Sequence, residues 1–250
     1  MNDNAKKWNK KYIWLGLLLF LVLVGLTIHN LGYRLKDNLT LGRDGKLNMV
    51  IGVPDSSIYI DYDQKIITTL ENENVSVPLS PRTHRIIVSS PGYYPWAKQI
   101  EVPSEGIVNL SPIYVKQNPD TLEIPKTDPE YLVIRNKIIK SDLPTINAPL
   151  TSTSKDSILW TADNAALVNN QTGTTTVIQP DTILKNVAFY KDRSDSIIFS
   201  TLNAIDMIEV SKVGTQNFMP IYKGTDPSFI TDQNNIIYVL DGEKLLKITL

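Results

Sequence analysis

The sequence predicts a mainly β protein that begins with a single transmembrane helix, continues with a small antiparallel β-sandwich and ends in incomplete β-propeller-like blades. Three observations predict this order: an uncharged apolar run at 12–31, short alternating apolar runs at 47–115, and a repeat with a spacing of 39 residues within 151–250. The composition, 42% hydrophobic and 20% charged, is that of a globular protein.

The first element is the apolar run from Ile13 to Ile28, which lies inside the uncharged stretch 12–31. Roughly 20 residues at about 1.5 Å each span a hydrocarbon layer of about 30 Å. A helix also satisfies every backbone polar group internally, as the lipid requires. We therefore expect residues 12–31 to cross the lipid bilayer.

The charges on either side of this run predict its orientation. Basic residues are enriched on its N-terminal side, so the positive-inside rule keeps residues 1–11 as a cytoplasmic tail and sends the following domains out of the cytoplasm. The chain is thus predicted to be a single-pass plasma membrane protein with its C-terminal domains extracytoplasmic. Four lysines precede the run and two basic residues follow it: Lys6, Lys7, Lys10 and Lys11, then Arg34 and Lys36.

A cleaved signal peptide is the competing interpretation of the same run. Its apolar region is typically about 7 to 15 residues long and ends in a small-residue cleavage site. The run here is longer, and the residues from Thr27 to Leu31 contain no such site. These criteria favour an uncleaved signal-anchor.

Residues 32–46 are polar and predict a stalk, and the alternation beyond them predicts an antiparallel sandwich at 47–115. Ile58 and Ile60 point to one face of a strand while Tyr59 points to the other. The further predicted strands lie around Val75 to Leu79, Arg85 to Ser89, Gln99 to Val102 and Ile107 to Leu110.

Residues 116–150 are predicted to be a proline-rich connector. Six of the fifteen prolines fall between Ser111 and Leu150. Proline lacks the backbone donor of a strand ladder and biases the preceding residue to extended geometry. We expect a semi-rigid segment with at most one or two short strands, one of them around Tyr131 to Arg135.

The last region, 151–250, repeats an apolar pair followed by an aromatic residue. A period near 40 with three or four strands per unit is typical of propeller blades, and about two and a half blades fit this region. A β-meander with accidental spacing is the alternative. The three copies begin 39 residues apart: Ile158 to Trp160, Ile197 to Phe199 and Ile236 to Tyr238.

The region 47–115 resembles the PEGA domain, a small β-sandwich of exported and surface-associated bacterial and archaeal proteins. That resemblance implies a fold and says little about chemistry. The residues that carry it are Ile58 to Asp61, Pro78 to His84, Ile86 to Ser89, the turn Pro91 to Tyr93, Pro95 with Trp96, and the closing pair Ile100 and Leu110.

The C-terminal repeats resemble the blades of TolB-like and WD40-like bacterial propellers. Most of this similarity lies in Ser228 to Asp232, followed by a short turn and Ile236 to Tyr238. An anchor, a PEGA-like domain and propeller-like blades together are similar to membrane-anchored PEGA proteins of uncultured bacterial lineages.

The composition and the motifs argue against most kinds of chemistry. The net charge of -1 offers no basic surplus for nucleic acid, and the absence of cysteine excludes thiolate sites. No phosphate-binding loop, dinucleotide fingerprint or HExxH motif occurs. The two histidines, His29 and His84, are expected to be structural. We therefore predict no catalytic residue, no cofactor, no metal and no enzyme activity.

The candidate ligand-contact residues are three aromatics, Tyr93, Tyr94 and Trp96, whose rings could stack on sugars. Their alternative role is to cover an edge of the sandwich. We expect a non-catalytic binding or structural role in the cell envelope, with an envelope protein or a surface polysaccharide as partner. The alternative is a membrane-anchored hydrolase, which would need a closed propeller with converging carboxylates.

Overall fold

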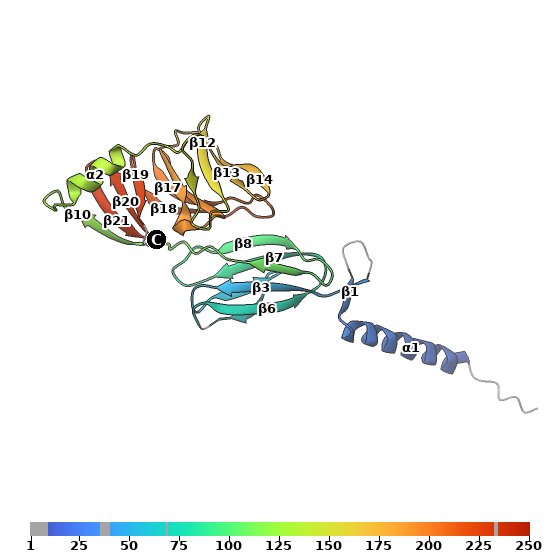
Figure 1. The fold of residues 1–250 in the computed structure, drawn as a ribbon. Coiled ribbons are helices and arrows are strands. Elements are labelled where there is room, and N and C mark those ends of the chain that lie inside the picture. Colours follow the sequence, from blue (N-terminus) through green and yellow to red (C-terminus); the bar gives the residue numbers. More distant parts are fainter. Residues whose placement is uncertain (1–9, 36–40, 69, 233–234) are drawn as a thin grey trace, which may run out of the picture. The chain divides into compact units, whose positions relative to one another are not determined.

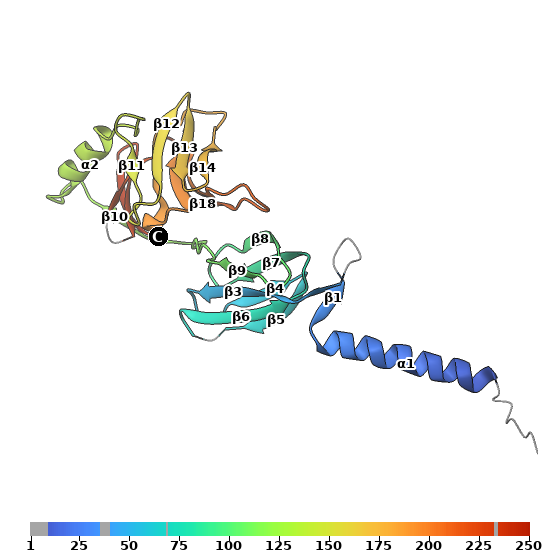
Figure 2. The ribbon, with the colours of Figure 1, turned by 45° about the vertical axis from the view of Figure 1, so that its right-hand side comes forward.

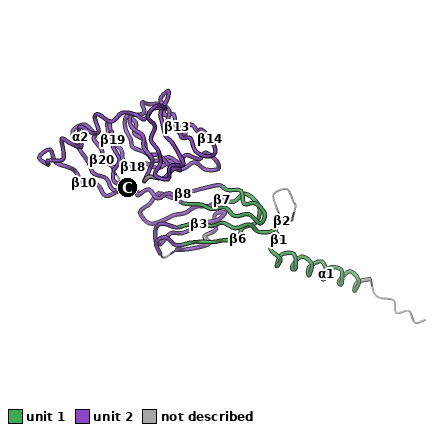
Figure 3. Tube along the Cα trace, in the orientation of Figure 1, with its two compact units in different colours: residues 1–50, 74–84, 100–111 green, residues 51–73, 85–99, 112–250 purple. Residues whose placement is uncertain are grey.

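The computed structural model describes residues 10–35, 41–68, 70–232 and 235–250 (Figure 1). The chain forms two compact units, and each is built from several segments. The first combines residues 1–50, 74–84 and 100–111, and the second combines residues 51–73, 85–99 and 112–250 (Figure 3).

The first unit begins with helix α1, Lys10–Asn30, which confirms the predicted apolar helix. Its leucine, valine and aromatic side chains are exposed, since none of the described residues buries them. After it, strands β1 (Tyr33–Leu35) and β2 (Leu41–Arg43) pair antiparallel inside the predicted stalk. Lys6 and Lys7 of the orientation argument lie outside the described residues.

The first unit also contains a three-stranded sheet of order β6-β3-β9. Its strands are β3 (Gly45–Ile51), β6 (Glu73–Leu79) and β9 (Ile107–Leu110). The central strand β3 alternates buried and outward side chains, as predicted for this region. The expectation of a purely antiparallel arrangement is wrong here, because β3 and β9 run parallel. Alternation shows which face of the sheet a residue occupies. It does not show whether the neighbouring strand runs parallel or antiparallel.

The second unit begins with a four-stranded antiparallel sheet of order β5-β4-β7-β8. The turn between β4 and β5 places Asp61 and Tyr62 at positive φ. Since the two sheets of region 47–115 belong to different units, their packing into one sandwich stays a prediction. The strands are β4 (Ser57–Ile60), β5 (Asp63–Ile67), β7 (Thr83–Ser89) and β8 (Trp96–Glu101).

Three further four-stranded antiparallel sheets follow in the second unit (Figures 1 and 2). The first contains β11 (Leu150–Thr151), β12 (Ile158–Ala162), β13 (Ala165–Asn170) and β14 (Gly173–Ile178). The second contains β15 (Asn186–Phe189), β16 (Ser196–Ser200), β17 (Ala204–Glu209) and β18 (Phe218–Lys223), with a 3₁₀ turn η1 at Tyr190–Asp192 between β15 and β16. The third contains β19 (Ser228–Asp232), β20 (Ile236–Asp241), β21 (Lys244–Thr249) and β10 (Asp120–Ile124).

The 39-residue repeat has a structural counterpart in these sheets. Each copy of the apolar pair and aromatic lies on the second strand of its sheet, β12, β16 or β20. The estimate of two and a half blades is wrong, because β10 pairs with β21 and gives the third sheet its fourth strand. The described residues form no closed ring of sheets.

The predicted strand around Tyr131 to Arg135 is instead part of helix α2, Tyr131–Ile139. Asp128 accepts a hydrogen bond from the Glu130 backbone N–H at its start, and Pro129 has the fixed φ that suits a first helical turn. The helix buries Tyr131, Ile134 and Ile138 against the third sheet. The apolar spacing of three and four residues, not alternation, is therefore the pattern that this segment follows.

Two cores hold the three C-terminal sheets. One joins the first and second sheets through Leu159, Val168, Val187, Phe199 and Ile208, among others. The other joins α2, β10 and the third sheet through Ile124, Leu240 and Leu245. The proline-rich segment thus supplies both a strand and a helix to the last sheet.

Candidate functional site

The three predicted aromatics lie on the segment between β7 and β8. Tyr93 and Tyr94 are partly exposed, and Trp96 is buried at 3% exposure. The Tyr93 ring packs edge to face on Tyr114, with ring centroids 5.9 Å apart. Backbone bonds join this segment to 115–117, including one from the Tyr94 N–H to the Val115 carbonyl. Contact with a ligand stays a prediction for all three side chains.

Trp96 belongs to a buried polar cluster centred on Glu209. The Trp96 Nε1–H donates to Glu209 Oε1 at 2.8 Å, and the Lys98 ammonium donates to Oε2 at 2.7 Å. Asn217 donates to the same carboxylate at 3.0 Å and pairs with both the N–H and the carbonyl of Ala97. Edge strand β8 is therefore fixed to β17 and β18 by satisfied polar groups.

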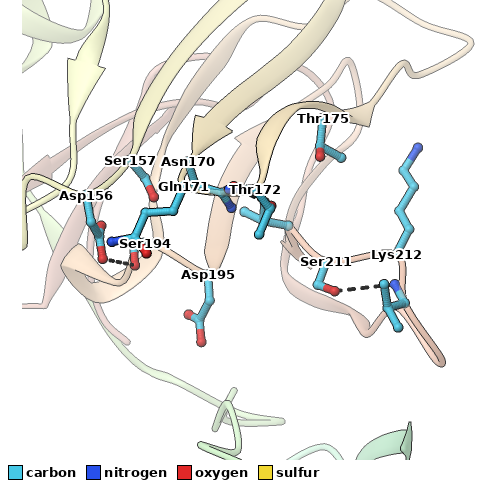
Figure 4. Close-up of a pocket in the computed structure, with 12 residues that line it drawn as sticks. Asp156, Ser157, Asn170, Gln171, Thr172, Thr175, Ser194, Asp195, Ser211 and Lys212 are labelled. Atoms are coloured by element: carbon cyan, nitrogen blue, oxygen red, sulfur yellow. Dashed lines mark hydrogen bonds between the residues drawn. The ribbon is translucent and has the colours of Figure 1, made fainter. Parts of the chain in front are cut away.

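A pocket of about 450 Å³ lies where the first two of the C-terminal sheets end (Figure 4). Residues before β12 and β16, the β13–β14 turn and the residues after β17 all meet there, because antiparallel hairpins bring these ends together. In Figure 4, Asp156 and Ser194 lie on one side of the pocket and Ser211 and Lys212 on the other.

The repeat brings the aspartates of two Asp-Ser pairs into this pocket. Asp156 with Ser157 and Asp195 with Ser196 occupy equivalent positions, 39 residues apart, and both aspartates line the cavity. The Ser194 hydroxyl donates to Asp156 at 3.4 Å and so links the two repeats. The third copy has asparagine, and Asn234 lies outside the described residues.

The two pocket carboxylates are held as hydrogen-bond acceptors. Hydroxyls of Ser154 and Ser152, at 2.6 and 3.0 Å, lower the pKa of Asp156. Asp195 forms a two-point ion pair with Arg193 at 2.6 and 2.8 Å. A general acid would need a raised pKa, so Asp156 does not suit the acid role that the hydrolase alternative requires.

The rest of the pocket offers hydroxyls and amides. Thr172 and Thr175 contribute hydroxyls, and Asn170 with Gln171 contributes amides. The Asn170 side chain accepts from both the N–H and the hydroxyl of Thr172, which fixes the β13–β14 turn. Such mixed donors and acceptors on a shallow surface suit hydroxyl-rich ligands.

The described residues contain no group of three or more histidine, cysteine or acidic side chains placed to hold a metal ion. His84 is buried, and its Nε2 lies 2.8 Å from the Ser80 carbonyl oxygen. His29 lies in the last turn of α1. The predictions of no metal, no cofactor and no enzyme activity stay predictions.

Sequence reasoning singled out Trp96 but missed Glu209, Lys98 and Asn217. Glu209 and Asn217 lie 111 to 120 residues from the residues of β8 that they contact, and no spacing rule connects them. The equivalent aspartates at 156 and 195 were visible as residues flanking the repeat. Only the strand pairing shows that they share a pocket.

No family model matches the chain, and no curated protein matches it. Among solved structures, a distant match is a protein of Bacteroides fragilis that is provisionally described as membrane-associated and of unknown function. It is 11% identical, the match covers 82% of this chain and 94% of that chain, and the TM-score is 0.22. The match assigns no family, so the resemblances to the PEGA domain and to bacterial propellers stay predictions.

Proposed function

We propose that this chain is a membrane-anchored, extracytoplasmic protein of the cell envelope with a non-catalytic binding role. The observation that carries the proposal is helix α1, whose apolar side chains are not buried by any part of the chain that the structure describes. Nineteen of its residues, Tyr12–Asn30, have a mean hydropathy of 2.2, and none is buried. An exposed apolar helix of this length matches the thickness of a lipid bilayer.

The exported part of the proposal rests on the lysines before the helix and on the β-rich body after it. Four lysines in residues 6–11 favour a cytoplasmic N-terminus. The strands beyond the helix fit the PEGA-like and propeller-like architecture of exported proteins. The pocket of hydroxyls, amides and ionised carboxylates supports binding of a surface polysaccharide more than catalysis.

The anchor is tested with the full chain carrying a C-terminal tag in a bacterial host. We expect the protein to stay in the membrane after carbonate extraction, to keep its N-terminus, and to lose its tag when protease is added to cells with a permeable outer surface. A protected tag, or a mature chain that begins after Gly32, would overturn the proposal.

A charge placed in the helix sharpens this test. The double variant Leu18→Arg/Leu21→Arg should leave the membrane fraction, because each arginine costs about 3 kcal/mol at the centre of a bilayer. Ile183→Arg is the matched control, since Ile183 is 62% exposed and Leu21 is 58% exposed. The control should fractionate as the unaltered chain does.

A further inference from the structure

A cluster of cations and tyrosines lies on η1 and the segment 112–117, and it adjoins the Asp156 pocket because Arg193 pairs with the pocket residue Asp195. At its centre, Lys191 has a left-handed backbone, with φ 50° and ψ 38°. This region of backbone space is unfavourable for a lysine, since it has a Cβ. The surrounding structure, rather than local preference, therefore holds this backbone conformation.

The side chain of Lys191 is held against buried tyrosine. Its Nζ lies 5.4 Å from the centroid of the Tyr190 ring. Tyr190 is 1% exposed, and its hydroxyl donates to the Tyr114 carbonyl at 2.9 Å, which fixes the ring. The ammonium is thus placed by a rigid support rather than extended freely into solvent.

The neighbouring charges do not neutralise Lys191. Burial, with the like charges of Lys116 and Arg193, lowers the pKa of Lys191 to about 8. Lys116 is paired with Asp120 at 2.8 Å, and Arg193 is paired with Asp195. Lys191 has no ion-pair partner among the described residues. The cluster therefore contains one cation that forms no ion pair with the side chains that the structure describes.

A predicted ligand-contact residue lies beside this cation cluster. Tyr93 and Lys116 face each other across an antiparallel bridge, and Tyr93 packs on Tyr114, whose carbonyl holds Tyr190. The Tyr93 side chain is partly exposed. Tyr93 is therefore connected to Lys191 through Tyr114 and Tyr190. An aromatic ring and an ammonium in one cluster suit an anionic sugar, because the ring packs on the sugar face and the cation binds its acid group.

We propose that Lys191, with Lys116 and Tyr93, binds carboxylate-bearing sugar units of an acidic polysaccharide. The inference rests on the proposed binding function and narrows its ligand class. The Asp156 pocket is less suited to this ligand, because two ionised carboxylates line it.

The test measures binding of the full chain, in a neutral detergent, to polygalacturonate and to uncharged dextran. We expect binding to polygalacturonate, weaker binding at high salt, and a loss of about tenfold in affinity for Lys191→Met. Lys155→Met is the matched control, because Lys155 is exposed and also has a positive φ of 60°. It should change the affinity by less than about twofold.

Two further readouts separate ligand binding from folding. Lys191→Gly should raise the melting temperature, since glycine adopts a left-handed backbone without a Cβ penalty, and should still lose binding. Affinity should also fall as pH rises through about 8 in the unaltered chain and in Lys155→Met, but not in Lys191→Met.

Each remaining outcome overturns the inference. If Lys191→Met binds polygalacturonate as tightly as the unaltered chain, the cation is not the contact. If dextran binds as well as polygalacturonate, the acid group is not recognised, although a polysaccharide-binding role survives. If neither polymer binds, the ligand class is wrong, while membrane fractionation still tests the anchor independently.

Discussion

Strand β17 contains two buried acids, and their surroundings differ. Glu209, at one end, is 5% exposed and accepts hydrogen bonds from Trp96, Lys98 and Asn217. Asp206, three residues earlier and on the other face, is 8% exposed and has no hydrogen-bond partner among the described residues. The first acid stabilises a junction between distant segments, and the second costs free energy when it ionises.

The largest effect is expected from removing the satisfied acid. Glu209→Ala leaves the Lys98 ammonium and the Trp96 N–H without their acceptor, and such a loss costs about 3 kcal/mol of unfolding free energy. Urea denaturation followed by circular dichroism would measure it. Lys98→Met/Glu209→Leu should recover part of the loss, because it removes both charges.

Glu243→Ala is the matched control, since Glu243 forms an exposed ion pair with Lys126. It should leave stability unchanged within error. Equal stability of Glu209→Ala and the unaltered chain would show that the junction of β8 with β17 does not contribute, and would remove the contrast with Asp206.

The next effect concerns the loop after β17 at the same junction. Gly214 has φ 71°, and a Cβ there would lie 2.2 Å from the Gln99 carbonyl oxygen of β8. Gly214→Ala therefore adds a steric clash to the backbone strain. Gly242 has φ 61° with nothing within 4 Å of such a Cβ, so Gly242→Ala carries the strain alone.

Comparing the two alanine variants isolates the contact with Gln99. We expect Gly214→Ala to be less stable than Gly242→Ala by about 2 kcal/mol, because overpacking against a fixed backbone atom cannot relax easily. Thermal melting in detergent gives the comparison. Indistinguishable melting temperatures would mean that the loop does not pack on β8.

Local sequence patterns were sufficient where the structure is local. Alternation predicted β4, β6 and β7, and the 39-residue repeat marked the second strand of each C-terminal sheet. The interpretation of local patterns failed for α2, where an apolar spacing of three and four residues inside a proline-rich segment was interpreted as a strand. It also could not predict that β10 pairs with β21, more than 100 residues away.

The candidate sites show the same limit. Tyr93 was identified by residue type. Its neighbours Tyr114 and Lys116 follow β9 in the sequence, with β8 and β9 lying between them and Tyr93. Lys191 drew no attention, because an isolated lysine in a sequence is ordinary. Its left-handed backbone and its place over Tyr190 exist only in the folded chain.

The smallest effect is expected from the unsatisfied acid, Asp206. Burial raises its pKa from near 4 to about 6, and the charge of Lys223 only partly opposes this. The unfolded chain therefore releases this proton near pH 4 and the folded chain near pH 6, so stability falls as pH rises between these values and stays lower above them.

Asp206→Asn should remove this loss and stabilise the protein at pH 7 by about 1 kcal/mol, a value reduced to allow for partial solvation. Melting temperatures of the variant and the unaltered chain should converge at pH 4 and separate toward pH 7. Exposed Asp142→Asn is the control and should follow the unaltered chain at every pH. If Asp206→Asn is less stable at pH 7, the Asp206 carboxylate has a stabilising partner in the folded chain, and the two acids of β17 do not differ in this respect.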